Sequence, residues 1–412
     1  MSTSSLAERY RATRATTDWI CEPLITEDFV VQSMPDASPV RWHLAHTTWF
    51  FETFVLKPAR GDYRPFDAQF EYLFNSYYNA VGPQPFRPMR GVLTRPSVAE
   101  VRRYRAHVDA AMLELLEQYG GAAGVVVLGL NHEQQHQELI VTDVKHMLSC
   151  NPLHPRYRDA PVRASGTAPS ARWIDGTDGL VEIGFGGDGF AFDNESPRHR
   201  VFLEPYQVGA HLVTCGEYRE FMADGGYRKP EFWLSDGWNI VRDRGWAAPM
   251  YWEPRENAWW MMTLSGARAV NDAEPVTHVS YYEADAYARW AGARLPAEAE
   301  WESVAAAYPM AGHFLESGNF HPVPARDDVP GGPTQLYGDV WQWTRSAYSP
   351  YPRYQPAAGA LGEYNAKFMC NQMVLRGASC ATPGSHARAT YRNFFPPEAR
   401  WQFSGIRLAR DA

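Results

Sequence analysis

Apolar side chains recur at spacings of three and four residues through most of the first 150 residues. This spacing lines one face of an α-helix, so it predicts helices. The predicted helices span residues 6–19, 39–57, 97–118 and 131–148. Ser38-Pro39 and Pro96-Ser97 suit the first turns of two of them, and Asn131 is the expected N-cap of the last. Four such helices predict a bundle.

The connection between the second and third predicted helices covers residues 58–96 and is rich in proline, glycine and aromatic residues. Compact domains seldom contain a structureless loop of this length unless the loop has a function. We therefore expect part of a functional site here.

The pattern changes after residue 150. Residues 151–171 are rich in Pro, Ala and Ser without periodicity, as is typical of an interdomain linker. From Trp173 onward, short segments punctuated by Gly and Trp, with helix-like pieces at 214–222 and 282–290, predict an irregular α+β domain. A chain of 412 residues is also too long for one ordinary core. The predicted organisation is a helical domain at 1–152, a linker at 153–172 and a second domain at 173–412.

Composition narrows the possible partners. The apolar fraction of 45% and the charged fraction of 21% are those of a globular protein, whereas the aromatic fraction of 14% is high and favours aromatic-lined pockets. The net charge is −8 with no basic run, which argues against a nucleic-acid partner because phosphate binding needs clustered lysine and arginine.

The same sequence argues against a membrane partner. The N-terminus lacks the apolar core of a signal peptide, and the longest apolar stretch, residues 125–130, is too short to cross a bilayer.

The five cysteines are scattered without C-x-x-C spacing, which disfavours both a disulfide framework and a thiolate zinc site. We expect a cytoplasmic protein with free thiols.

Two histidines stand out on the fourth predicted helix. His132 and His136 are four residues apart, so their imidazoles lie on one helix face and can chelate one metal ion. A pair of partly exposed polar histidines would have the same spacing. The segment also matches H-E-x-x-H, in which zinc proteases use the glutamate, here Glu133, as a general base.

The further ligands of a zinc protease are missing. One extended form of the motif needs glycine at the position of Leu139 and histidine at that of Thr142. The other form needs a glutamate some twenty residues downstream, and residues 150–171 contain none. The protease interpretation is therefore disfavoured.

A third ligand can come from the second predicted helix, where either His43 or His46 could face the bundle interior. Bundle cores commonly build metal sites from side chains on facing helices. Three neutral imidazoles with open positions suit iron(II), zinc or copper(II), so the ligand type alone leaves the metal open.

Three segments together resemble a known family. SPVRWHLAHTTWFFE at 38–52, HEQQHQE at 132–138 and RWQFSGIRLA at 400–409 resemble the ergothioneine-biosynthetic sulfoxide synthases. The resemblance covers nearly the whole chain. It implies a DinB-like four-helix bundle followed by a formylglycine-generating-enzyme-type domain of C-type-lectin-like fold. It also implies that His46, His132 and His136 bind Fe(II).

By this resemblance, the reaction would be iron- and O2-dependent. It would join the thiol of cysteine to the imidazole C2 of hercynine, which is trimethylated histidine, and give the sulfoxide. Three histidine ligands leave the iron open positions for the thiolate, the imidazole and O2. The expected partners are therefore small molecules.

The resemblance also implies residues that hold hercynine. Gln135 matches a family position that helps bind the histidine-derived substrate, and Asn393 and Phe394 match positions lining the same pocket. A quaternary ammonium favours aromatic faces, which this C-terminal stretch supplies. An ordinary aromatic core would look the same in sequence.

The sulfur donor is less directly implied. Relatives that use γ-glutamylcysteine bind it with an Asp and an Arg, whereas the matching positions here are Phe395 and Ala399. This departure favours free cysteine, with Phe395 in the pocket and Arg87 or Arg90 binding the cysteine carboxylate. A solvated loop is the alternative for these arginines.

Oxygen chemistry of this kind needs a proton donor, and a tyrosine hydroxyl can serve. Tyr77 and Tyr78 are our candidates, because the long loop that carries them can fold over the metal. Tyr348 or Tyr351 of the second domain is the alternative.

Other functions stay open at this point. A formylglycine-generating oxidase would need catalytic cysteines near the C-terminus, and residues 385–393 contain none. An ovothiol-type synthase would join cysteine to unmethylated histidine at another ring carbon. A lectin-like binding module with a vestigial metal bundle is a third possibility.

Overall fold

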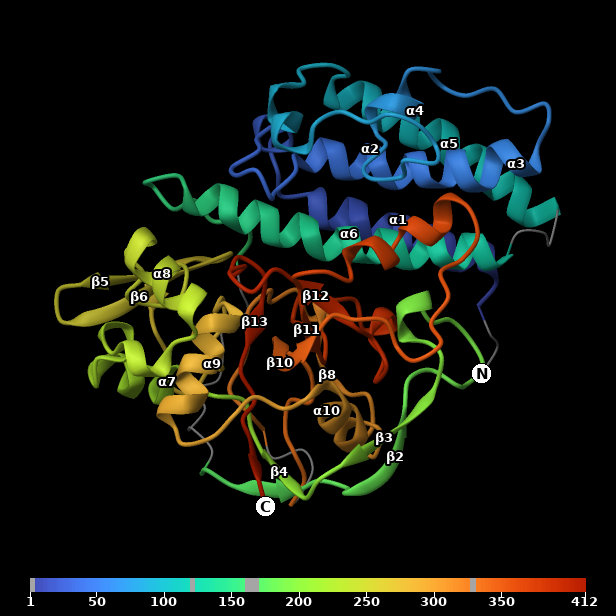
Figure 1. The fold of residues 1–412 in the computed structure, drawn as a ribbon. Coiled ribbons are helices and arrows are strands. Elements are labelled where there is room, and N and C mark those ends of the chain that lie inside the picture. The colour runs from blue at the N-terminus through green and yellow to red at the C-terminus, as the bar shows by residue number, and fades with distance from the viewer. Residues whose placement is uncertain (1–3, 119–122, 160–169, 327–330) are drawn as a thin grey trace. The chain divides into compact units, whose positions relative to one another are not determined.

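The computed structural model describes residues 4–118, 123–159, 170–326 and 331–412. Residues 160–169 of the linker expected at 153–172 lie outside the described residues. The chain divides into two compact units. The first consists of residues 1–157 and 357–364, and the second of residues 158–356 and 365–412 (Figure 1).

The first unit is built from four long helices, as the periodicity predicted. They are α1 (Leu6–Cys21), α2 (Val40–Phe51), α5 (Val98–Gln118) and α6 (Ala123–Ser149). Helix α2 packs against both α5 and α6, and α1 packs against α6 (Figure 1). Within the described ranges, no helix combines the length and apolarity needed to cross a bilayer.

Side chains fix the starts of two helices. Ser5 and Glu8 form a reciprocal capping box at the start of α1. At the start of α5, the Ser97 backbone N–H donates to the Glu100 carboxylate at 2.7 Å, and the Glu100 N–H donates to Ser97 Oγ at 3.3 Å. The expected first turn at Pro96-Ser97 is therefore confirmed.

Two helix predictions were wrong in detail. Helix α6 starts at Ala123, so Asn131 lies inside it and its side chain donates to the Val127 carbonyl at 2.9 Å instead of capping a helix. The helix begins early because the apolar stretch before Asn131 continues the buried face. The segment predicted as one helix at 39–57 is α2, then a π-helical turn at Glu52–Leu56 (η2), then α3 (Lys57–Ala59).

The long connection contains short ordered pieces. These are α4 (Phe70–Leu73) and a 3₁₀ segment at Arg87–Val92 (η3). Between them, the Asn75 side chain donates to the carbonyls of Tyr78 and Gly82, both at 3.0 Å, and accepts the Tyr78 N–H at 3.1 Å. This asparagine therefore closes the turn that carries Tyr77 and Tyr78.

A short segment of the C-terminal half belongs to the helical unit. Residues 357–364 include a 3₁₀ turn at Ala360–Glu363 (η8). The Glu363 carboxylate accepts the backbone N–H groups of Asn79 at 3.0 Å and Ala80 at 2.7 Å. These bonds attach the segment to the Tyr77–Tyr78 turn. The helical unit thus includes residues that the sequence analysis assigned to the second domain at 173–412.

The second unit is an irregular assembly of small sheets. Its largest sheet has the order β12-β11-β10-β13, in which only the β10–β13 pair is parallel. The strands of that sheet are β10 (Trp341–Ala347), β11 (Met373–Arg376), β12 (Asn393–Phe395) and β13 (Ser404–Gly405).

Among the described residues, ten further strands form four smaller sheets, with orders β1-β4-β14, β2-β3, β5-β6-β7 and β8-β9. They are β1 (Trp173–Asp175), β2 (Gly179–Ile183), β3 (His199–Leu203), β4 (Tyr206–Gly209), β5 (Trp252–Arg255), β6 (Ala258–Thr263), β7 (Gly266–Ala269), β8 (Gly312–His313), β9 (Tyr337–Gly338) and β14 (Ala409–Asp411). Trp301, Tyr206 and Tyr337 are buried in a core with aliphatic residues of β2, β3 and β4.

The described part of the second unit contains four α-helices. They are α7 (Cys215–Ala223), α8 (Ser235–Arg244), α9 (Tyr281–Trp290) and α10 (Glu298–Ala305). Helices α7 and α9 correspond to the predicted pieces at 214–222 and 282–290, and capping boxes at Thr214 and Ser280 fix their starts. Helix α8 was not predicted.

A buried carboxylate gives the second unit a testable pH dependence. Glu274 is fully buried, and it accepts from Arg268 at 2.6 Å and pairs with His321 at 3.1 Å. Burial alone would raise the pKa of Glu274, but His321 and Arg268 hold it at about 2. Because this folded-state pKa is depressed, the stabilisation is complete above about pH 5 and is lost as the pH falls towards 2.

We expect this linkage to contribute about 3 kcal/mol to the free energy of unfolding at neutral pH. Denaturant unfolding between pH 7 and 3 should therefore show a smaller loss of stability in Glu274→Gln than in the unmodified protein. Equal pH slopes in the two proteins would contradict the assignment.

Candidate metal centre

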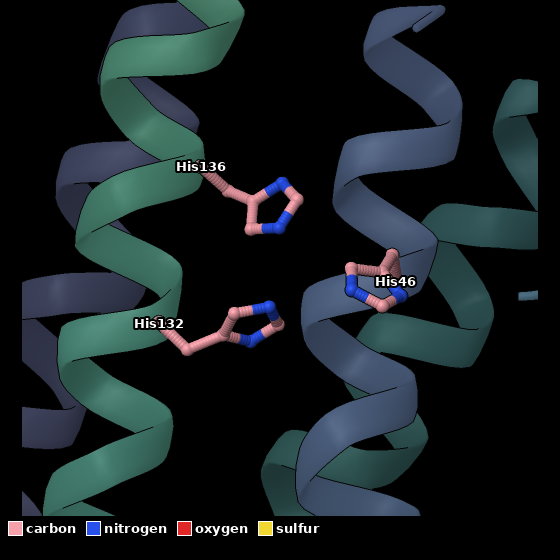
Figure 2. Close-up of side chains that lie close together, drawn as sticks. All are labelled: His46, His132 and His136. Atoms are coloured by element: carbon pink, nitrogen blue, oxygen red, sulfur yellow. The ribbon is translucent and has the colours of Figure 1, made fainter. Parts of the chain in front are cut away.

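Three histidines from two helices point toward one another inside the bundle. Helix α6 carries His132 and His136 one turn apart, and α2 carries His46 on the facing side (Figure 2). One nitrogen from each ring lies within 4.8 Å of the others. The ring centroids are 5.0 Å apart for His46 and His132, 5.0 Å for His46 and His136, and 4.6 Å for the α6 pair. We call these residues the histidine cluster.

The cluster is buried and electrically neutral. Exposed fractions are 0% for His46, 1% for His132 and 9% for His136. Burial lowers the pKa of all three, to about 3 for His132, and the neighbouring histidines lower the pKa of His46 and His136 further. A neutral imidazole has a lone pair, which is the form that binds metal.

Several cluster nitrogens lack a hydrogen-bond partner among the described residues. These are Nε2 of His46 and both ring nitrogens of His132. Buried polar atoms without partners are costly and rare. Nitrogens about 2.1 Å from a shared metal ion lie about 3 to 4 Å apart, so small side-chain movements from the observed spacing of up to 4.8 Å would bring the three nitrogens to ligation distance. The three residues fit a metal ion.

The structure separates the roles of His43 and His46, which the sequence left open. His46 Nδ1 donates to the Phe74 carbonyl at 2.6 Å, which leaves Nε2 for the cluster. Its ring is stacked between Trp42, at a centroid distance of 4.5 Å, and Trp49, at 5.5 Å. His43 lies outside the cluster, with Nδ1 2.8 Å from His136 Nδ1.

Glu133 is not placed to act as the base of a zinc protease. Its carboxylate is fully buried and accepts from Arg14 at 2.8 Å, Arg105 at 2.8 Å and Thr17 at 2.7 Å. Burial alone would raise the pKa of Glu133, but Arg105 and Arg14 hold it at about 2. The carboxylate is therefore engaged in an ion-pair network that joins α1, α5 and α6.

Three tyrosines lie near the cluster within the first unit. The Tyr364 ring is 5.7 Å from that of His132, and its hydroxyl donates to Gln135 Oε1. Tyr77 packs against Tyr364 at a centroid distance of 6.3 Å and stacks on Tyr78 at 4.6 Å. Tyr78 is fully buried against Trp49, and burial raises its pKa well above the usual value.

Arg90 is a buried cation close to the cluster. Its guanidinium lies 3.4 Å from the centroid of the Trp42 ring and donates to Ser38 Oγ and Ser76 Oγ, both at 3.0 Å. Within the described residues, it forms no ion pair with a carboxylate. Burial lowers its pKa to about 9. Arg87 is exposed and donates to the Asp36 carbonyl.

Known families match both parts of the chain. The DinB superfamily matches residues 9–140, and the sulfatase-modifying factor enzyme 1-like domain matches residues 161–412. The hercynine oxygenase of Mycolicibacterium thermoresistibile is 31% identical over 92% of this chain and 88% of the relative. That of Mycolicibacterium smegmatis is 31% identical over 92% of each chain.

The chain belongs to the hercynine oxygenase family. The fold class predicted from sequence, a DinB-like bundle followed by a formylglycine-generating-enzyme-type domain, is confirmed. The formylglycine-generating enzyme of Streptomyces coelicolor is also similar, with 28% identity over 61% of this chain and 95% of the relative.

The remaining predicted residues of this family member lie in the second unit. Asn393, Phe394 and Phe395 form β12, where Phe394 is stacked on Tyr348 at a centroid distance of 4.0 Å. The Tyr348 hydroxyl accepts from Asn194 at 2.8 Å. Tyr351 is also buried, and both tyrosines are part of the packing of that unit.

Sequence reasoning missed Tyr364 and the role of Gln135 as its partner. Tyr364 follows a stretch rich in glycine and alanine far from the histidine motif, and no local pattern marks it. Only the return of residues 357–364 to the helical unit brings this tyrosine to His132.

Close packing of α2 and α6 depends on a glycine. A Cβ added at Gly129 would lie 2.6 Å from Phe51 and 3.0 Å from Phe50, whose ring contacts His132. We expect Gly129→Ala to destabilise the protein by about 1–3 kcal/mol and to weaken metal binding. Gly124→Ala is the matched control on the same helix, because no described atom lies within 4 Å of its added Cβ.

Thermal unfolding and metal titration of the two glycine variants would test this packing. Gly124→Ala should be unchanged or more stable by up to about 1 kcal/mol, since alanine favours a helix over glycine. Equal behaviour of the two variants would contradict the role of Gly129.

Proposed function

We propose that this chain is a non-haem Fe(II)- and O2-dependent sulfoxide synthase. It joins the thiol of cysteine to the imidazole C2 of hercynine and gives hercynylcysteine sulfoxide. The C–S bond forms as the C2–H and S–H bonds are lost, and the sulfur is oxidised to the sulfoxide. O2 accepts four electrons, with one oxygen atom retained on sulfur and the other released as water.

The observation that carries this proposal is the buried cluster of His46, His132 and His136 in a member of the hercynine oxygenase family. Three neutral ligands leave positions for substrates on a metal ion. Bound Fe(II) would supply the electron transfer that lets O2 react with a thiolate and an aromatic ring. The engagement of Glu133 by Arg14 and Arg105 argues against hydrolytic zinc chemistry.

Arg90 is proposed to bind the carboxylate of cysteine. A buried guanidinium that has two hydroxyls and a tryptophan face as partners is costly until an anion pairs with it. Arg87 can add a second positive charge from the surface of the same η3 segment. The absence of an acidic residue at Phe395 and of a basic one at Ala399 favours cysteine over γ-glutamylcysteine.

Gln135 of the first unit is proposed to hold hercynine, and Asn393, Phe394 and Phe395 of the second unit stay predictions from the resemblance. The Gln135 amide can bond to a polar group of the substrate as well as to Tyr364. Aromatic faces favour the trimethylammonium group because it is a diffuse cation. In the second unit, the ring of Phe394 stacks on the ring of Tyr348.

The proton donor is proposed to be one of Tyr364, Tyr77 and Tyr78. The contact of Tyr364 with His132 favours it, and Tyr77 and Tyr78 can act through it or in its place. Replacing the proton donor with phenylalanine should divert the thiol toward dioxygenation, with less sulfoxide formed. Product ratios by mass analysis for Tyr364→Phe, Tyr77→Phe and Tyr78→Phe would identify the residue; unchanged ratios in all three would exclude this group of tyrosines.

One incubation tests metal, acceptor and donor together. Under anaerobic conditions, iron-loaded protein is incubated with hercynine and either cysteine or γ-glutamylcysteine. The mixture is then exposed to O2, and the products are identified by mass spectrometry. We expect the sulfoxide from hercynine and cysteine. A product formed from histidine instead of hercynine would indicate an ovothiol-type synthase. If the protein neither binds iron nor consumes oxygen, the enzyme hypothesis fails and the lectin-like binding module becomes the favoured function.

We also propose a cytoplasmic location. The structure contains no disulfide among Cys21, Cys150, Cys215, Cys370 and Cys380. Thiols that remain reduced are typical of proteins in a reducing compartment.

A further inference from the structure

A fourth buried histidine and a carboxylate continue the hydrogen-bonded contacts of the histidine cluster. His43 is 2% exposed and Asp143 is 5% exposed. His43 Nδ1 lies 2.8 Å from His136 Nδ1, and His43 Nε2 lies 3.0 Å from Asp143 Oδ2. Asp143 follows His136 by two helical turns on α6, so both residues face α2. The three side chains form one continuous hydrogen-bonded chain.

The donors and acceptors along this chain can be assigned in order. Asp143 Oδ2 also accepts the backbone N–H of Ser38 at 2.8 Å. Because Oδ2 accepts that backbone N–H, it also acts as the acceptor for His43, which therefore donates from Nε2. With its proton on Nε2, His43 has its lone pair on Nδ1 and accepts the Nδ1–H of His136. The lone pair of His136 is therefore on Nε2.

His46, the cluster histidine on α2, has the same tautomer as His136. His46 has its proton on Nδ1, which donates to the Phe74 carbonyl, and its lone pair is on Nε2. Without a fixed acceptor, a neutral imidazole can have its proton on either nitrogen. A proton on Nε2 of His136 would block that nitrogen from binding a metal ion.

We propose that Asp143 and His43 are positioning residues that set the His136 tautomer and its ring orientation, and so are required for tight metal binding by the histidine cluster. The inference rests on the metal site of the proposed function. Hydrogen-bond partners behind a ligand typically change metal affinity by about 10- to 100-fold. His43 thus acts through His136 and is not itself a ligand.

The sharpest variant is Asp143→Leu, because leucine keeps much of the side-chain volume and removes the oxygen that accepts from His43. Asp143 Oδ2 accepts from both Ser38 and His43, so an asparagine oxygen at that position would preserve both bonds, whereas leucine preserves neither. Without this acceptor, the His43 proton can move to Nδ1, and His136 loses its fixed hydrogen-bond acceptor. Asp109→Leu is the matched control, because Asp109 bonds to Tyr10 and Arg14 instead.

Two measurements on the full chain test the proposal without turnover. Nitrogen NMR of metal-free protein labelled at histidine should show the His136 proton on Nδ1 in the unmodified protein and distributed over both ring nitrogens in Asp143→Leu. Titration with Co(II) alone, followed by its visible absorption, should show affinity lowered about 10- to 100-fold in Asp143→Leu and unchanged in Asp109→Leu.

His43→Leu provides a second route in case Asp143→Leu does not fold. Leucine fills much of the same volume but cannot accept from His136, so Co(II) affinity should also fall about 10- to 100-fold. Unchanged Co(II) affinity in the folded variants, or a His136 proton that stays fixed on Nδ1 in Asp143→Leu, would overturn the proposal. If the unmodified protein itself fails to bind Co(II), the proposed function fails as well, which separates the two outcomes.

Discussion

Replacing His46 with alanine is expected to abolish turnover and to lower metal affinity by more than about a hundredfold, which exceeds the loss expected for a residue behind a ligand. The protein should stay folded. His46 is fully buried, and its Nε2 has no hydrogen-bond partner among the described residues. Alanine therefore removes a nitrogen that a bound metal ion would pair with, and breaks no hydrogen bond of that nitrogen. Metal content of the purified variant and oxygen uptake with hercynine and cysteine would measure the effect.

A histidine away from the cluster provides the control. His107 lies on α5, is exposed, and pairs with the Arg64 carbonyl at 3.0 Å. His107→Ala should keep both metal content and oxygen uptake. Normal activity of His46→Ala would show that the cluster is not the catalytic centre, whereas loss of folding would be visible as loss of helical circular dichroism.

Replacing Glu133 with alanine is expected to destabilise the bundle strongly. The substitution leaves buried Arg14 with Asp109 as its remaining carboxylate partner, and buried Arg105 with Asp18 at 3.5 Å. Breaking a buried ion pair from one side costs about 3–5 kcal/mol in free energy of unfolding. Denaturant unfolding would measure the loss.

An exposed ion pair in the same unit is the control for this substitution. Arg11 and Glu117 pair at 2.5 Å, with side chains 51% and 57% exposed. Glu117→Ala should cost less than about 1 kcal/mol, because solvent screens such pairs. Similar losses in the two variants would mean that the Glu133 network contributes little. A role for Glu133 as a catalytic base would instead predict lost activity at unchanged stability.

Local sequence determines much of the helical unit. The 3.6-residue periodicity predicted α1 and α5 nearly to the residue, and the structure adds Ser–Glu capping contacts at both starts. The start of α6 was misplaced because Asn131 is a good N-cap in isolation, whereas packing of the apolar stretch before it favours a longer helix. Tertiary packing overrides local preference at such positions.

The candidate site was predictable to different degrees. The spacing of His132 and His136 fixes their common face, so this pair followed from geometry. His43 and His46 are both buried on α2, and contacts with distant chain decide between them. His46 meets the carbonyl of Phe74, and His43 meets Asp143. Such partners cannot be read from spacing along one helix.

The return of residues 357–364 to the helical unit means that the bundle cannot be obtained intact by cutting the chain after Tyr157. A fragment of residues 1–157 would contain His46, His132 and His136 but would lack Glu363 and Tyr364. The helical unit is therefore not encoded as one continuous stretch: its last piece lies two hundred codons downstream of residue 157, within the gene segment of its neighbour.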